Sequence, residues 1–293
     1  MANLVKKISM KGKKGDLIHI PMPTRGDPSA KAAFTAVTIQ QALESEKTVT
    51  IDQHWEYSKL IEDIADLQAL NSMRKFYVDD AGYALAKRLD THLIRLGACT
   101  NGSTVTAGVA ATTTNNVYAE GYIGGDGTTA YTSASTGNAS ALTDAAIRRT
   151  IQRLDDADAP MEARYIVIPP SARNTLMGLA RFTEQAFTGE SGGGNTIRNG
   201  QIGDIYGMPV YVTSNADTPN VASGTKPRAV LIFQRDAFVL AEQQTIRTQK
   251  QYKQEYLADL LTSDMVFGTQ ILRNSTTSGA GDEATAFALI VPA

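Results

Sequence analysis

The stretch NSMRKFYVDDAGYALAKRLDTHLIRL, residues 71–96, contains no proline and one internal glycine, Gly82. Apolar side chains recur along it at every fourth position: Tyr77, Ala81, Leu85, Leu89 and Leu93. This spacing predicts a single amphipathic helix, which Gly97 brings to an end. At about 1.5 Å per residue the helix is roughly 40 Å long, about twice the length of an average globular helix. We therefore expect a strut that crosses the molecule.

The segment before this helix, SKLIEDIADLQAL at residues 58–70, has apolar residues at three- and four-residue steps and predicts a short amphipathic helix of its own. Further upstream, residues 17–22 and 47–55 alternate between apolar and polar side chains, as half-buried strands do. About two dozen residues separate these limbs, too many for an ordinary hairpin turn. The sequence thus predicts a long arm with two paired limbs. Its connecting segment carries the charged residues Arg25, Asp27, Lys31, Glu44 and Glu46.

Downstream of the long helix, residues 100–140 are rich in Thr, Gly, Ala and Ser and predict short strands and exposed loops. A helix then begins at a Thr143 cap in LTDAAIRRTIQRLDDADAP and is followed by a strand, RYIVIPP, and a second helix, SARNTLMGLAR. Alternating helices and strands favour a compact α/β subdomain. The later apolar runs RAVLIFQRDAFVLAEQQTIRTQ and TAFALIVPA predict strands that return the chain to the first unit.

The subdomain ends in GQIGDIYGMPVYVTSN, residues 200–215, which has two interpretations: a phosphate-binding loop or a turn that leads into a strand. A phosphate loop presents successive backbone N–H groups from a helix N-terminus. Here no Lys-Ser/Thr pair and no helix start follow, and proline removes one N–H donor where an alternating run begins. The pattern favours a structural turn built on Gly200, Gly203, Gly207 and Pro209.

Other candidate chemistry is incomplete. His19, His54 and His92 lie on separate segments without a metal-binding spacing. The acidic run LDDADA, with Asp155, Asp156 and Asp158, lacks the ligand pattern of a calcium loop and is interpreted as solvated acids at a helix end. No GxSxG elbow or Cys-His signature appears. We predict no catalytic residue, metal or cofactor; the alternative, a hydrolase or nucleotide-binding enzyme on residues 141–227, needs convergent polar groups in a pocket.

The composition is typical of a soluble, folded protein, with 42% hydrophobic and 20% charged residues. With 28 basic and 30 acidic side chains the net charge is -2, which supplies no field for attracting a nucleic-acid backbone. No apolar run reaches about eighteen residues, so no membrane span is expected. Cys99 is the only cysteine, which excludes an intrachain disulfide. The first fourteen residues carry five lysines and are expected to be a solvated, flexible arm, with contact to nucleic acid or an acidic neighbour as the alternative.

The order of these parts, a two-limbed arm, a strut helix and an α/β unit, resembles that of the major capsid protein of tailed bacteriophages, the Hong Kong phage-type shell fold of the α+β class. The most specific stretches are residues 50–90, 164–177 and 203–215. The first is similar to a segment in the capsid proteins of short-tailed phages (podoviruses). The resemblance implies four parts: an N-terminal arm at 1–15, an extended loop at 16–55, a peripheral domain at 56–140 and 228–293 with its spine helix at 71–97, and an axial domain at 141–227.

The resemblance also implies a structural, non-enzymatic role. Subunits would self-assemble into hexamers and pentamers of an icosahedral shell that encloses double-stranded DNA. A near-neutral chain can enclose DNA without sequence-specific binding. The implied partners are many copies of the chain itself, with scaffolding, portal and decoration proteins as further candidates. Assembly would take place in the cytoplasm of a bacterial host, and the final location would be the virion capsid. The alternative on the same fold is an encapsulin-type cellular compartment.

The extended loop is where we expect contacts between subunits, because an arm that reaches across a neighbour buries surface that no monomer can bury. At its tip, Arg25, Asp27 and Lys31 are expected to pair with charges on adjacent subunits, with Glu44 and Glu46 as further contact residues. Some relatives join an extended-loop lysine to an asparagine of a neighbour. Lys31 is the only lysine in the segment that connects the two limbs, and its position alone does not predict such a link. The loop GESGGGNTIRNG is expected to line the capsomer centre.

Overall fold

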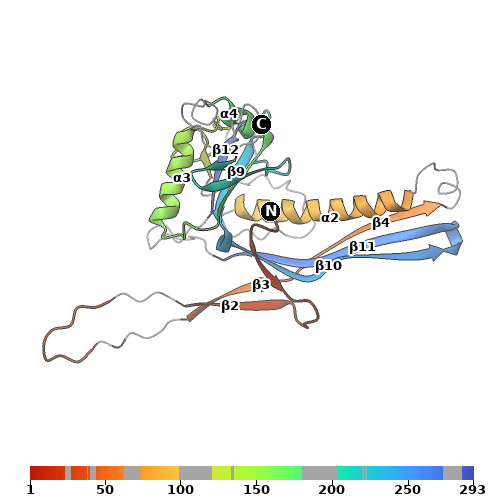
Figure 1. Cartoon of the computed structure of the whole chain (residues 1–293), viewed down its shortest axis with the longest axis horizontal. Helices are drawn as coiled ribbons and strands as arrows, with labels where there is room; N and C mark the ends of the chain where they lie inside the picture. The colour runs from red at the N-terminus through yellow and green to blue at the C-terminus, as the bar shows by residue number, and fades with distance from the viewer. Residues whose placement is uncertain are drawn as a thin grey trace.

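A computed structural model describes residues 1–23, 28–37, 39, 44–62, 73–98, 121–132, 135–179, 203–219, 221, 223–272 and 286–293. Figure 1 shows three parts. A long helix, α2 (Met73–Ala98), lies along a four-stranded sheet, and a compact unit with a six-stranded sheet sits at one end of the helix. A two-stranded hairpin projects away from both.

The four-stranded sheet has the order β1-β10-β11-β4. Its strands are β1 (Lys6–Ser9), β10 (Phe238–Lys253), β11 (Ala258–Ile271) and β4 (Gln53–Glu62). The central pair forms an antiparallel ribbon whose strands are 16 and 14 residues long, joined by the 3-10 helix η2 (Gln254–Tyr256). β4 pairs antiparallel with β11, and β1 pairs parallel with β10. The ribbon therefore accompanies α2 along its length (Figure 1).

Helix α2 follows the amphipathic pattern of its sequence. Ala81, Leu85 and Leu93 are buried, and Tyr77 and Leu89 are half-buried. Of these, Leu85 and Leu93 belong to a core shared with β10, β11 and a further strand, β9 (Arg228–Gln234). With 26 residues the helix is roughly 39 Å long. The prediction of one long strut helix is confirmed, although Gly97 does not end it, because the helix continues to Ala98.

The compact unit holds a six-stranded sheet of order β5-β12-β9-β6-β8-β7. The strands are β5 (Gly121–Ile123), β12 (Ala286–Val291), β9 (Arg228–Gln234), β6 (Arg164–Ile168), β8 (Met208–Val212) and β7 (Asp204–Ile205). Its helices are α3 (Asp144–Asp156) and α4 (Pro170–Met177). Thr143 caps α3, since its hydroxyl accepts a hydrogen bond from the backbone N–H of Ala146 at 3.3 Å. The predicted cap and the predicted helices and strands of this unit are present.

Both faces of the six-stranded sheet are covered, which explains why its central strands are continuously apolar. In β9, Val230 and Ile232 pack into the core formed with α3 and α4. The alternate residues Leu231 and Phe233 pack into the core formed with α2 and β10. The short 3-10 helix η1 (Arg235–Ala237) then leads the chain from β9 into β10. Because α2 packs against both sheets, it connects the compact unit to the ribbon.

The sheet order differs from the domain limits expected from the sequence. β5, β9 and β12 lie outside residues 141–227, yet they pair in the same sheet as β6 and β8. An apolar run identifies a buried strand but not its neighbours in the sheet. The structure therefore assigns residues 121–123, 228–234 and 286–291 to the compact unit.

The projecting hairpin consists of β2 (Leu17–Pro23) and β3 (Glu44–Thr50), which pair antiparallel from Leu17 with Thr50 to Pro23 with Glu44. The predicted pairing of the two limbs is confirmed for residues 17–22, which pair with residues 45–50. Residues 53–55, expected to belong to the return limb, instead begin β4 and pair with β11. At its base Val49 is fully buried in a small core that includes Val239 of β10. The hairpin is thus anchored at one end on the four-stranded sheet and extends away from it (Figure 1).

Two expectations are wrong. Residues 58–62, expected to begin a short helix, are the second half of β4, where Leu60 pairs with Leu260 of β11; residues 63–70 lie outside the described residues. Hydrogen bonding to a long neighbouring strand overrides a short helical period. The N-terminal segment is not a free arm either. β1 pairs with β10, and Val5 is only 1% exposed, although the five lysine side chains all face solvent.

Candidate assembly surfaces

The described part of the arm tip, residues 28–37 and 39, presents apolar side chains to solvent. Phe34, Val37 and Ile39 are 107%, 72% and 89% exposed. Phe34 sits in a turn with a left-handed φ of 62°, next to a hydrogen bond from Thr35 Oγ1 to the carbonyl of Ala32 at 2.8 Å. Large apolar side chains gathered on an exposed projection indicate a surface that another molecule covers.

The predicted contact residues of the arm fall in different places. Arg25 and Asp27 lie outside the described residues, while Lys31 is exposed next to the apolar tip and Glu44 begins β3. Glu46 has a partner within the hairpin, because its Oε2 lies 3.1 Å from Nδ1 of His19. Glu46 of β3 is therefore paired across the hairpin with His19 of β2 in the same subunit. A contact of these residues with a second subunit stays a prediction.

The free end of the β10–β11 ribbon is a second exposed apolar surface. Tyr252, Tyr256 and Leu257 are 45%, 63% and 66% exposed, and Leu257 has a left-handed φ of 44°. β11 was not predicted from the sequence, although Ser263, Met265 and other alternate residues are buried along it. This period of two is the signal that could have revealed the strand.

The glycine-rich stretch forms a tight hairpin in the compact unit. Tyr206 and Gly207, with φ of 51° and 76°, form the two-residue turn between β7 and β8. Positive φ at both positions is the pattern of a type I′ turn. Gly203 precedes β7 and Pro209 lies within β8, while Gly200 is outside the described residues. The residues that follow the turn directly form β8, so the interpretation as a turn that leads into a strand agrees with the structure.

This hairpin adds a third apolar surface. The Tyr206 hydroxyl donates a hydrogen bond to the carboxylate of Asp144 at the start of α3. Tyr206, Tyr211 and Val212 are 50%, 43% and 45% exposed, and Met161 of the same unit is 79% exposed. The loop GESGGGNTIRNG, expected at the capsomer centre, lies outside the described residues.

Asp155 and His54, two of the polar residues considered from the sequence, lie in structural pairs. Asp155 accepts from Arg164 at 2.7 Å, and His54 Nε2 lies 3.5 Å from Asp264. A hydrogen bond from Tyr57 to Asp80 raises the pKa of Tyr57 to about 12. Within the described ranges no three His, Cys, Asp or Glu side chains are placed to hold a metal ion. A pKa shift that arises from a structural pair of this kind does not by itself indicate a functional site.

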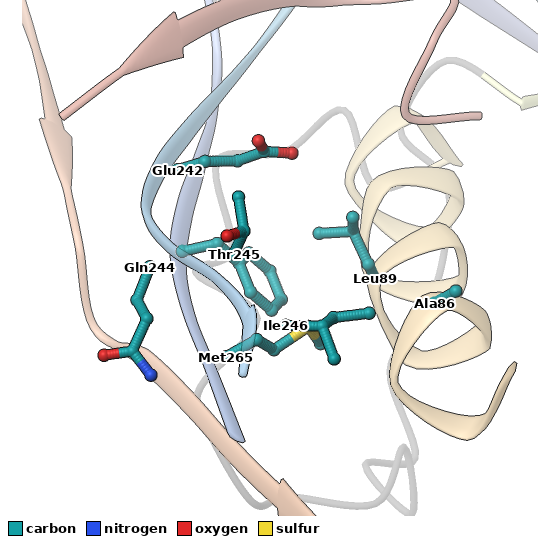
Figure 2. Close-up of a pocket in the computed structure, with 8 residues that line it drawn as sticks. Ala86, Leu89, Glu242, Gln244, Thr245, Ile246 and Met265 are labelled. Carbon is teal, nitrogen blue, oxygen red and sulfur yellow. The ribbon is translucent and has the colours of Figure 1, made fainter. Parts of the chain in front are cut away.

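One cavity of about 340 Å³ opens between α2 and the edge of β10 (Figure 2). The lining is mainly apolar and carries a single charged side chain: Ala86, Leu89, Glu242, Gln244, Thr245, Ile246, Met265 and Phe267. The register of β10 against β11 shifts twice beside it, between Glu242 and Gln244 and between Gln244 and Arg247. Such bulges bend a strand, and here they lie where β10 lines the cavity.

The arrangement of a long helix on a β ribbon, a compact α/β unit and a projecting hairpin has close counterparts among solved structures. The chain is similar to a structure of Mycobacterium phage Che8, with 18% identity, a TM-score of 0.69 and coverage of 98% of this chain and 89% of that one. The chain is also similar to the capsid of the cyanophage P-SCSP1u, with 17% identity, a TM-score of 0.68 and coverage of 98% of this chain and 86% of that one. It is similar to the capsid of Ralstonia phage GP4 as well, with 15% identity, a TM-score of 0.68 and coverage of 99% of this chain and 87% of that one. The chain has the Hong Kong phage-type shell fold.

The sequence itself matches the family model described as phage capsid protein over residues 62–273. This range is more than half of the 293 residues, so the chain belongs to the phage capsid protein family. It is a major capsid protein, a subunit of the phage shell. A comparison with curated protein sequences finds no significant match. Among the described helices, none combines the length and the apolar character needed to cross a membrane.

Proposed function

We propose that copies of this chain assemble into hexamers and pentamers of a closed icosahedral shell around the double-stranded DNA of a tailed phage. The observation that carries the proposal is the hairpin β2–β3, whose tip exposes Phe34 and Ile39 almost completely. A monomer gains nothing from holding apolar groups on a projection, whereas a ring of subunits buries each tip on the next subunit. Repeated arm-to-neighbour contacts are heterologous and close into rings when the rotation permits.

In this proposal the parts of the subunit have separate roles. The compact unit with the six-stranded sheet is the axial domain at the capsomer centre, and the four-stranded sheet with α2 is the peripheral domain. Arg25, Asp27 and Lys31 pair with charges on adjacent subunits, because salt-sensitive contacts allow correction before the shell closes. Charge reversal at all three positions should shift the salt dependence of assembly; unchanged assembly would remove this role.

The partners follow from the same proposal. The net charge of -2 suits a shell that encloses DNA without sequence-specific binding. Scaffolding, portal and decoration proteins are the proposed further partners, and assembly is proposed to occur in the cytoplasm of a bacterial host. The family assignment favours a phage shell over an encapsulin-type compartment. The narrower likeness to short-tailed phages stays a prediction.

Negative-stain electron microscopy of the purified protein, alone and with candidate scaffolding proteins, tests the proposal together with size-exclusion chromatography. Closed shells or ring-shaped capsomers are the expected result. A monodisperse monomer under every condition would contradict it and would favour the remote alternative, an enzyme built on residues 141–227.

A further inference from the structure

The cavity beside α2 is an open apolar pocket with room for an aromatic ring. Its volume is about 340 Å³, and an apolar cavity of about 150 Å³ already accommodates benzene. Figure 2 shows Leu89 of the helix and Ile246 and Met265 of the strands pointing toward the space between them, and Ala86 lies on the same helix. Ile246 is 43% exposed, so the pocket opens at the surface. The pocket therefore lacks an apolar group that would fill it.

The arm tip has the opposite property, because it presents an aromatic ring that nothing covers. Phe34 is 107% exposed and lies in a left-handed turn. A left-handed φ is unfavourable for a residue with a Cβ atom, by about 1–2 kcal/mol. The hydrogen bond from Thr35 Oγ1 to the Ala32 carbonyl, at 2.8 Å, supports this turn. The ring is thus held outward before any partner arrives, which lowers the entropy that binding must overcome.

The pocket cannot receive the tip of its own chain without loss of the hairpin. β2 and β3 are paired over seven positions, and this pairing directs the tip away from α2 (Figure 1). Every copy carries both the Phe34 ring and this pocket, on separate surfaces. Such a pair of surfaces makes a heterologous contact, in which each subunit inserts into the next.

We propose that Phe34 of one subunit inserts into the pocket between α2 and β10 of the neighbouring subunit and fixes the register of the arm on that neighbour. This inference rests on the proposed shell function and names the receptor for its arm. Charge supports the same pairing. Lys31 lies three residues before Phe34, and Glu242 is the charged side chain at the pocket. When the ring is inserted, the lysine ammonium has an acidic partner within reach at the rim.

Photo-crosslinking tests the contact directly. Phe34 is replaced by benzoylphenylalanine, which keeps an aromatic side chain and reacts well with methionine, and Met265 lines the pocket. We expect ultraviolet light to link position 34 to the peptide that contains Met265. Mixing isotopically heavy and light subunits before assembly shows that the link joins two copies. The same group at Tyr211, on the exposed surface of the compact unit, is the matched control and should not label that peptide.

Substitutions test the energetic role. Phe34→Ala should raise the concentration at half-assembly at least about tenfold, as for a buried aromatic anchor. Ala86→Phe, which fills the pocket from the helix, should have the same effect, while Lys87→Phe on the exposed side of α2 should not. Lys31→Glu and Glu242→Lys should each weaken assembly by about two- to fivefold, and the double variant should recover it.

The outcomes separate the two proposals. Capsomers or shells that form with crosslinks at the Met265 peptide support the pocket assignment. Particles that form without these crosslinks, or a Phe34→Ala variant that assembles like the parent, overturn the pocket assignment and leave the shell function intact. A parent protein that forms no particles under any condition overturns the shell function and the arm contact with it.

Discussion

The guanidinium of Arg74 lies 2.5 Å from Oδ2 of Asp259, whose side chain is only 6% exposed. The ammonium of Lys250 lies 2.9 Å from the same oxygen. Arg74 is in the first turn of α2, where the helix dipole disfavours a cation. Asp259 is on β11 and Lys250 on β10, so one buried carboxylate offsets that charge and joins the helix to both strands of the ribbon.

Asp259→Asn should lower the free energy of unfolding by about 1–3 kcal/mol, because two cations lose their shared counter-charge. The loss stays below that of a fully buried pair because Arg74 and Lys250 are 44% and 51% exposed, where solvent screens charge. Urea denaturation of the unassembled subunit measures the difference. Glu255→Gln, on the nearby ribbon end, is the control and should change stability by less than about 0.5 kcal/mol. Equal stability of the Asp259→Asn variant and the parent would contradict this role.

The turn between β7 and β8 provides a matched pair of glycines. A Cβ atom at Gly207 or at Gly203 would meet no atom within 4 Å, but only Gly207 has a left-handed φ, of 76°. Gly207→Ala should therefore cost about 1 kcal/mol through backbone strain alone. Gly203→Ala should be neutral or slightly stabilising, because it restricts the unfolded chain. Thermal unfolding of both variants is the measurement, and equal midpoints would show that the turn does not depend on Gly207.

The sequence predicted those elements whose pattern is local. The stripe of α2 repeats over five turns, and the Thr143 cap and the Tyr206–Gly207 turn are set by neighbouring residues. What it missed depends on partners far along the chain. The sequence of residues 58–62 predicts a helix because Leu60 and Ile61 fit a helical period. Their conformation is instead decided by pairing with β11, which lies some two hundred residues later in the chain.

The assembly surfaces were only partly predictable for the same reason. The charge of Lys31 was visible in the sequence, but the exposure of Phe34 depends on a turn in the projecting arm. The pocket beside α2 needs Leu89 from the helix and Ile246 from a bulged strand to be brought together. Neither residue is distinctive in the sequence, because an exposed and a buried isoleucine look alike until the register of β10 is known.

We predict that acid destabilises the folded subunit through His92. Burial, together with the charge of Arg88, lowers the pKa of His92 to about 4, and its Nδ1 lies 3.0 Å from the hydroxyl of Thr269. The unfolded chain binds a proton near pH 6.5, whereas the folded chain binds it only near pH 4, so folding is progressively destabilised as pH falls between these values. The shift in the pKa of His92 lowers the free energy of unfolding by up to about 3 kcal/mol at acid pH. His92→Asn, which keeps a polar atom near Thr269, should lose less stability between pH 7 and pH 4.5 in urea denaturation. Identical losses in parent and variant would exclude His92 as the cause.

We predict that the fold has no room for a side chain at Gly268, at the base of the arm. A Cβ atom there would lie 2.2 Å from the carbonyl oxygen of Thr50 and 2.9 Å from Cα of Ile51, both of them backbone atoms that cannot move aside as a side chain can. Gly268→Ala should therefore cost more than about 3 kcal/mol or detach β3 from β11, since overpacking of backbone forces the strands apart.

The matched control is Gly82→Ala in α2, where a Cβ atom would meet nothing within 4 Å. Because alanine is the better helix former, this change should stabilise the subunit by about 0.5–1 kcal/mol. Thermal unfolding measures both variants, and limited proteolysis between β2 and β3 reports whether the base of the arm has opened. We expect faster cleavage for Gly268→Ala and parent-like cleavage for Gly82→Ala. A Gly268→Ala variant with the melting temperature and cleavage rate of the parent would mean that β11 does not hold the arm through this close approach.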